Sequence, residues 1–321
     1  MRDGEPIMTT PIIVAAAAAL LAGVTVPLPL GQGAAPVAGD IDIIEIDRDR
    51  HDRMTVPVTI GTTGGTGGPY RFLVDTGAER TVLARHVATD LALVPAGRAT
   101  VIGIAGSMAV DLVEVDEVSL GRRSFYSLTA PLLEGRHIGA DGIIGIDGLQ
   151  DQRVLLDFQK RLMAVSDAAS LGGNRGFEIV VRARRKSGQL IMTNALVEGV
   201  RTDVVIDTGA TTSIGNRALQ RQLAKRGKLS QTALMSVTGQ SIVAEMALVR
   251  HMRVGDLTMD GFYIAFADAP PFAALGLSEK PAMLMGMNEL RGFRRVAIDF
   301  QTRKVLFDLP EQRGINLRPM Y

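Results

Sequence analysis

The chain has 321 residues, enough for two lobes of about 130 residues each, and 46% of them are apolar, so a sizeable core is available. Its formal net charge of +1 gives no electrostatic argument for a nucleic acid or an acidic partner. The absence of cysteine excludes disulfides, thiol nucleophiles and cysteine-ligated zinc. The 35 glycines and the many Val and Ile runs favour β-structure with tight turns.

Near the N-terminus, residues 11–30 are uncharged and dominated by Ala, Leu, Val and Ile. A stretch of about 20 such residues fits a signal peptide or a single membrane anchor. Pro27 and Pro29 limit the helical part to residues 12–26, which favours a signal peptide; a buried core helix is the minor alternative. Residues 31–39 form a Gly/Ala/Pro tether. We therefore expect export to the periplasm or another extracytoplasmic compartment. Cleavage of the segment and its retention as an inner-membrane anchor both stay open.

Residues 40–167 predict a first β-rich lobe. Its expected strands are 41–46, 55–60, 70–74, 99–106, 108–115, 154–158 and 162–165, with one short helix near 84–91. The glycine-rich residues 61–68 predict a long, flexible turn, because the Gly-Lys-Ser/Thr of a phosphate-binding loop is missing. The strand 70–74 ends abruptly in Asp75-Thr76-Gly77-Ala78. A hairpin is expected to turn at Ala105-Gly106-Ser107, and the apolar pair Ile143-Ile144 precedes Gly145.

A small-residue linker at 168–176 is followed by a second lobe at 177–321, in which the same pattern restarts. Its expected strands are 190–197, 202–206, 296–301 and 305–307, with a hairpin inside 234–248 and a basic helix near 217–226. The strand 202–206 ends in Asp207-Thr208-Gly209-Ala210. The hairpin is expected to turn at Thr238-Gly239-Gln240, and Leu284-Met285 precedes Gly286.

The two halves therefore form an internal repeat of about 130–140 residues. The aspartate motif, the hairpin, the apolar pair before glycine and the closing strands recur in the same order. Taken singly, Asp75 and Asp207 would be interpreted as ordinary aspartates in turns at the ends of strands. Their duplication within a matching repeat favours a shared chemical role.

The doubled Asp-Thr-Gly-Ala motif resembles the active-site signature of retropepsin-like aspartic proteases. The resemblance implies an all-β fold of two β-barrel lobes related by a pseudo-twofold axis, each lobe with one short helix. It also implies an aspartic endopeptidase that acts as a monomer on polypeptide substrates, without metal or cofactor. The catalytic residues would be Asp75 and Asp207. Supporting residues would be Thr76, Gly77, Ala78, Thr208, Gly209 and Ala210, and the flaps over the substrate would contain Gly103, Ala105, Gly106, Ser107, Val237, Thr238 and Gly239.

The residues fit the chemistry of such an enzyme. Two neighbouring carboxyl groups cannot both ionise easily, so the pKa of one rises and that of the other falls. The ionised carboxyl can then accept a proton from water while the protonated one donates to the scissile carbonyl oxygen. Because Ala78 and Ala210 offer no hydroxyl to the carboxylates, we expect a weakly acidic optimum, around pH 5–6.

Two departures from the resembled family accompany the match. Viral members carry an arginine shortly after the apolar-Gly motif, whereas Gly145 is followed by Ile146-Asp147. Neither expected flap contains the tyrosine of pepsin-like enzymes. The alternative to an enzyme is a catalytically silent peptide-binding protein of the same fold in the cell envelope. The four histidines are widely separated and offer no His-x-x-x-His spacing for a metal ion.

Overall fold

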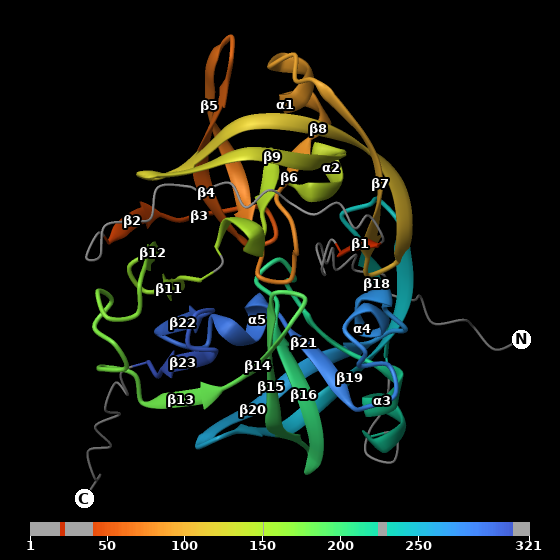
Figure 1. Cartoon of the computed structure of the whole chain (residues 1–321). Coiled ribbons are helices and arrows are strands. Elements are labelled where there is room, and N and C mark those ends of the chain that lie inside the picture. The colour runs from red at the N-terminus through yellow and green to blue at the C-terminus, as the bar shows by residue number, and fades with distance from the viewer. Residues whose placement is uncertain (1–19, 23–40, 150, 224–229, 311–321) are drawn as a thin grey trace, which may run out of the picture.

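The computed structural model describes residues 20–22, 41–149, 151–223 and 230–310 (Figure 1). It is mostly β-structure, arranged as two barrel-like lobes that lie above and below a shared sheet (Figure 1). This confirms the predicted fold class of two retropepsin-like lobes.

The first lobe is built on a nine-stranded sheet in the order β1-β7-β8-β9-β6-β10-β5-β4-β3. An additional pairing between β8 and β4 closes most of it into a barrel. Its strands are β1 Leu20–Ala22, β3 Asp47–Arg48, β4 Met54–Thr62, β5 Gly65–Val74, β6 Val82–Ala84, β7 Pro95–Gly103, β8 Gly106–Leu120, β9 Arg123–Leu133 and β10 Gly142–Ile144. Val56, Val58 and Ile60 alternate along β4 and are buried, as expected for a strand with one face in the core.

The second lobe repeats this plan in an eight-stranded sheet, in the order β14-β15-β16-β21-β17-β20-β19-β18. Here β15 pairs with β19 to close the barrel. The strands are β14 Arg184–Lys186, β15 Gln189–Val197, β16 Val200–Ile206, β17 Ser213–Gly215, β18 Ser230–Met235, β19 Ser241–Val254, β20 Leu257–Phe266 and β21 Ala282–Met285. In both lobes the strand that ends in aspartate runs parallel to the apolar strand before the later glycine: β5 beside β10, and β16 beside β21.

A six-stranded antiparallel sheet joins the lobes, in the order β13-β23-β22-β11-β12-β2. Three strands come from each lobe: β2 Asp42–Glu45, β11 Arg153–Asp157 and β12 Leu162–Ser166 from the first, and β13 Ile179–Arg182, β22 Arg295–Asp299 and β23 Lys304–Asp308 from the second. At its centre Arg153 pairs with Asp299 at 2.7 Å, and both side chains are buried. The expected hairpins at 154–165 and 296–307 are confirmed, but they also pair with each other, which the repeat did not reveal.

The helices of the described residues are all short, and each lobe contains more than the single helix expected. They are α1 Arg85–Asp90, α2 Gly135–Ile138 and a 3-10 turn at Ile146–Gly148 in the first lobe, and α3 Arg217–Leu223, α4 Pro270–Ala274 and α5 Met287–Leu290 in the second. The helices α2, α4 and α5 are one turn each, too short to show an apolar periodicity in the sequence.

The glycine-rich segment at 61–68 is not the long turn that was predicted. β4 and β5 stay paired through Thr62 and Gly65, so only Thr63 and Gly64 lie outside the ladder. Backbone hydrogen bonds need no side chain, which is why a run of glycines can still form a strand pair.

The N-terminal prediction falls mostly outside the described residues. Of the expected helix at 12–26, the structure describes only β1, which pairs antiparallel with Thr100–Ile102 of β7 and is therefore a strand. Within the described ranges there is no helix long and apolar enough to cross a membrane.

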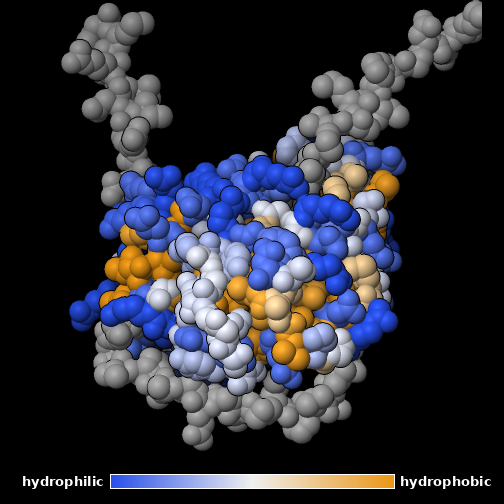
Figure 2. Space-filling model, turned by 90° about the horizontal axis from the view of Figure 1, so that it is seen from above, coloured by the Kyte–Doolittle hydropathy of each residue, from blue (hydrophilic) through white to orange (hydrophobic). Residues whose placement is uncertain are grey.

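The surface seen from above is a mixture of hydrophilic and hydrophobic areas (Figure 2). Scattered exposed apolar side chains such as Tyr126 and Tyr263 are normal for a folded protein, since polar groups alone cannot cover it. The large apolar clusters lie inside the two lobes.

Candidate active site

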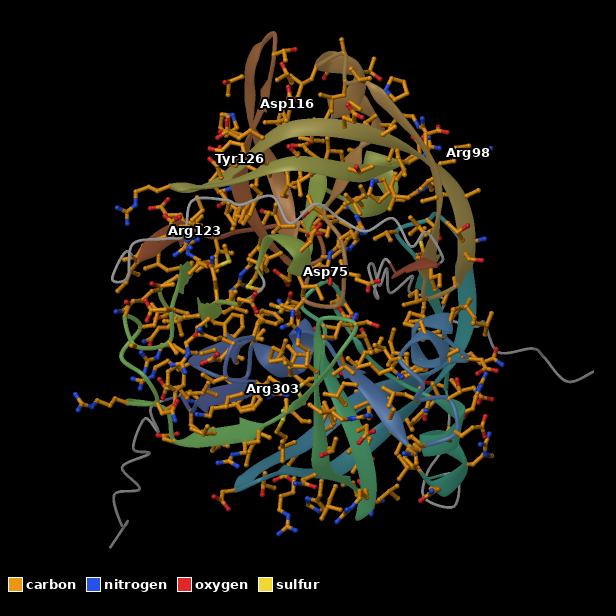
Figure 3. All side chains as sticks on the ribbon, viewed as in Figure 1. Asp75, Arg98, Asp116, Arg123, Tyr126 and Arg303 are labelled. Carbon is orange, nitrogen blue, oxygen red and sulfur yellow. The ribbon has the colours of Figure 1, made fainter. Side chains whose placement is uncertain are left out.

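Asp75 and Asp207 lie at the ends of β5 and β16, where the two lobes meet, and Asp75 is at the centre of the molecule in Figure 3. The amide of Asp75 donates to the carbonyl of Ile144 at 3.0 Å, and that of Asp207 donates to the carbonyl of Met285 at 2.9 Å. These bonds continue the parallel pairing past the strand ends. Both aspartates are completely buried.

One oxygen of each carboxyl is held by its own loop. Oδ1 of Asp75 accepts the amides of Gly77 and Ala78 at 2.8 and 3.0 Å. Oδ1 of Asp207 accepts the amides of Gly209 and Ala210, both at 3.1 Å. Within the described residues, the Oδ2 atoms have no hydrogen-bond partner. They are the atoms available to a third group.

The glycines of the motif allow the loops to cross. A Cβ added to Gly77 would lie 2.7 Å from Oδ1 of Asp207, and one added to Gly209 would overlap the carboxyl of Asp75. Each glycine therefore faces the aspartate of the opposite lobe, and a side chain at either position would push the carboxyls apart.

The threonines of the motif link the lobes. The amide of Thr76 donates to Oγ1 of Thr208 at 3.0 Å, and the amide of Thr208 donates to Oγ1 of Thr76 at 3.3 Å. Each hydroxyl then donates across the interface, Thr76 to the carbonyl of Ile206 at 2.9 Å and Thr208 to that of Val74 at 2.6 Å. This reciprocal set of four hydrogen bonds fixes the position of one aspartate relative to the other.

Burial makes both carboxyls hard to ionise. Desolvation raises the pKa of Asp75 to about 6, although its amide donors and the positive charge of Arg53 oppose the shift. Desolvation and the nearby Asp75 carboxylate raise the pKa of Asp207 well above its usual range. One carboxyl ionises near neutrality while the other keeps its proton, which is the arrangement needed for paired general base and general acid.

Two further carboxyls, the half-buried Asp147 and the buried Glu289, brace the loops from behind, and the sequence did not single them out as functional. Asp147 accepts the amide and the hydroxyl of Thr81, at 2.9 and 2.8 Å. Glu289 accepts the hydroxyl of Ser213, the residue equivalent to Thr81 in the second lobe. Desolvation raises the pKa of both, that of Glu289 to about 7. Asp147 stands close to where viral relatives of the resembled family carry arginine.

The proposed flap residues of the two lobes lie next to each other. Gly103 ends β7, Ala105 lies in the following turn, and Gly106 and Ser107 begin β8; Val237, Thr238 and Gly239 form the turn between β18 and β19. A Cβ on Gly103 would lie 3.4 Å from Cγ2 of Thr238, and one on Gly106 would lie 2.8 Å from Oε1 of Gln240. The two hairpin tips are therefore in contact.

The tip of the first hairpin is also inserted into the second lobe. Ile104, which the sequence analysis passed over, is completely buried in an apolar cluster of the second lobe that includes Leu234 and Phe272. The hairpin turns at Ile104-Ala105, one residue earlier than expected. In this conformation the two hairpins are closed on each other.

A family model described as aspartyl protease matches residues 56–147 and 193–288. The chain belongs to the aspartyl protease family. Each match contains one Asp-Thr-Gly-Ala motif, so the family's lobe occurs twice, as the internal repeat indicated. A comparison with curated proteins found no match. No group of three or more acidic or histidine side chains able to hold a metal ion occurs in the described parts of this aspartyl protease chain.

Proposed function

We propose that the chain is an aspartic endopeptidase that hydrolyses peptide bonds between its two lobes, with Asp75 and Asp207 as the catalytic pair. The observation that carries this proposal is the pair of buried carboxyls whose Oδ2 atoms have no hydrogen-bond partner among the described residues while their Oδ1 atoms are held by amides. A structural aspartate would use both oxygens in local contacts.

The reaction needs one ionised and one protonated carboxyl. The carboxylate accepts a proton from water as the water oxygen attacks the scissile carbonyl carbon, and the other carboxyl donates its proton to the carbonyl oxygen. The carboxyl that took the proton from water then gives it to the amide nitrogen, and the other carboxyl takes a proton back from the gem-diol. The C–N bond breaks, a carboxylic acid and an amine are released, and the pair returns to its starting protonation state. No covalent enzyme intermediate forms.

The closed flap supports a polypeptide as the substrate class. A substrate has to displace the hairpin tips from each other and then lie between them and the aspartates. An extended peptide can pair with strand edges such as β7, which already accepts β1 as a neighbour.

The test is incubation of the purified protein, from residue 40 onwards, with a diverse peptide mixture at several pH values. Asp75→Asn, Asp207→Asn and the double variant should each abolish cleavage to nearly the same extent, because members of one catalytic unit act non-additively. Asp256→Asn, at an exposed turn, is the matched control and should retain full activity. Substantial activity in either single variant would contradict the two-lobe mechanism. Peptide binding without cleavage by the unmodified chain would favour the silent binding protein.

We further propose that the folded part lies outside the cytoplasmic membrane, which is supported by the uncharged stretch at 11–30. A reporter that is active only in the cytoplasm, fused after residue 39, should give no signal. A strong cytoplasmic signal would contradict export.

A further inference from the structure

Arg53 and Gln189 occupy equivalent positions in the two lobes but differ in charge. Thr55 pairs with the residue two before Asp75, and Ile191 pairs with the residue two before Asp207. Arg53 and Gln189 each lie two residues before these partners, where β4 and β15 begin.

Both side chains reach across to the opposite motif. Nη1 of Arg53 donates to the carbonyl of Gly209 at 3.4 Å, and Nε2 of Gln189 donates to the carbonyl of Gly77 at 2.6 Å. The contact is therefore the same in both lobes. The side chain that makes this contact carries a full positive charge in the first lobe, Arg53, and no charge in the second lobe, Gln189.

The charge on Arg53 is held in place and away from water. Its side chain is completely buried, with Nη2 at 2.6 Å from Oδ2 of Asp49 and at 2.5 Å from the carbonyl of Ile138. Gly209, whose carbonyl Arg53 contacts, is also the residue at which an added Cβ would overlap the carboxyl of Asp75. Arg53 thus contacts the residue that lies against the Asp75 carboxyl.

The other charged groups around the pair do not duplicate this effect. Asp147 and Glu289 are engaged with Thr81 and Ser213 behind the two loops, one in each lobe. His51 is partly buried, and desolvation and Arg53 lower its pKa, which favours the neutral imidazole. Among the residues that the structure describes, Asp49 is the carboxylate that forms an ion pair with Arg53.

We propose that Arg53 is a positioning residue that makes the two aspartates unequal by holding the negative charge on Asp75. Resting on the proposed function, this assigns Asp75 as the base that takes the proton from water and Asp207 as the acid that donates to the scissile carbonyl oxygen. The proton transfers are those of peptide hydrolysis as described above, with Asp75 as the first acceptor and Asp207 as the first donor. Arg53 lowers the pKa of Asp75, while the carboxylate of Asp75 raises that of Asp207, in agreement with this order of ionisation.

The experiment compares two substitutions that change the charge in opposite directions. Arg53→Gln keeps a donor, removes the positive charge and makes the first lobe like the second. Asp49→Asn leaves Arg53 without its counter-charge. The acid limb of the pH–rate profile for peptide cleavage should move up in Arg53→Gln and down in Asp49→Asn, by roughly half to one pH unit each, which is about a three- to tenfold change in rate on that limb. Arg50→Gln, an exposed charge three residues away, should leave the limb in place.

General damage to the fold would lower the rate at every pH. It would not shift the acid limb in opposite directions in Arg53→Gln and Asp49→Asn. Shifts in the same direction, or an unmoved limb in Arg53→Gln, would overturn the proposal. If Arg53→Gln does not fold, the downward shift in Asp49→Asn and an unmoved limb in Arg53→Lys decide the matter.

A second readout separates this inference from the proposed function. Carboxyl-labelled aspartate can be titrated by NMR in the unmodified chain, with Asp75→Asn and Asp207→Asn used to assign the signals. Asp75 should ionise first, and its midpoint should rise in Arg53→Gln. If the chain cleaves no peptide yet titrates in this way, the proposed function fails and the inference stands. If it cleaves peptides but Asp207 ionises first, the inference alone fails.

Discussion

The threonine bridge between the lobes gives a prediction whose magnitude can be worked out from the structure. Thr208→Val keeps the size of the side chain but removes the hydroxyl. The amide of Thr76 and the carbonyl of Val74 would then lose their partner in a fully buried interface. Each unsatisfied buried group costs about 1–3 kcal/mol, so for the two groups together we expect a loss of about 2–6 kcal/mol in the free energy of unfolding.

Thr55 provides a matched control. It is as deeply buried as Thr208, yet its hydroxyl has no hydrogen-bond partner in the structure. Thr55→Val makes the same chemical change without breaking a bond, and should be neutral or stabilising by up to about 1 kcal/mol. Urea unfolding of both variants and of the unmodified chain measures the difference in the free energy of unfolding. The comparison is made with the same slope of this free energy against urea concentration for all three proteins. Equal losses in the two variants would refute the assignment of the bridge as the stabilising element.

Further predictions concern the pH range, the crossing of the loops and the flap. Activity should rise as the pH increases through about 6, where Asp75 ionises, and fall when Asp207 loses its proton, so the optimum should lie above the range of 5–6 expected from the sequence. Adding hydroxyls through Ala78→Ser with Ala210→Ser should move the pH–rate profile towards acid by roughly half to one unit. An unchanged profile would show that the alanines do not determine the pKa values of the aspartate pair. Since burial raises the pKa of Asp75 from 3.8 to about 6, the contribution of Asp75 to the free energy of unfolding should be fully present below pH 3.8 and lost as the pH rises to about 6; an equal pH dependence of unfolding in the unmodified chain and in Asp75→Asn across this range would contradict it. Gly209→Ala should abolish cleavage, because its Cβ would overlap the Asp75 carboxyl, whereas Gly64→Ala, whose Cβ would meet only Oγ1 of Thr62 at an ordinary contact distance of 3.7 Å, should not. Ile104→Ala should speed hydrogen exchange of the hairpin amides in β7 and β8, because the flap would lose its buried anchor; unchanged exchange would mean that other contacts hold it closed.

The parts of the fold that depend on local pattern were predictable from the sequence. The strands that end in Asp75 and Asp207 are apolar, β-branched runs stopped by turn residues, and the structure places them as predicted. The turn at Glu198-Gly199 between β15 and β16 follows from the same kind of signal. The doubled motif identified the family because one short pattern recurred at a fixed distance.

Features that depend on long-range pairing were not predictable from the sequence. The contact of β11 with β22 joins residues in different lobes, and neither strand has a sequence pattern that identifies the other as its partner. Ile104 lies inside an apolar run, so its insertion into the other lobe leaves no distinct signal in the chain. Arg53 and Gln189 share no residue type. They are equivalent because each lies two residues before the residue that pairs next to its motif, Thr55 or Ile191. This position is known only from the register of β4 with β5 and of β15 with β16.

The sheet that joins the lobes also sets the order in which the chain can become complete during synthesis. β11 is made about halfway through translation, but its neighbour β22 begins only at Arg295, and β23 and β13 must then pair beyond it. A first lobe that has already left the ribosome therefore keeps one open strand edge while the whole second lobe is made. A nascent chain stalled before residue 295 would therefore present one open edge of β11 and an incomplete second lobe at the same time.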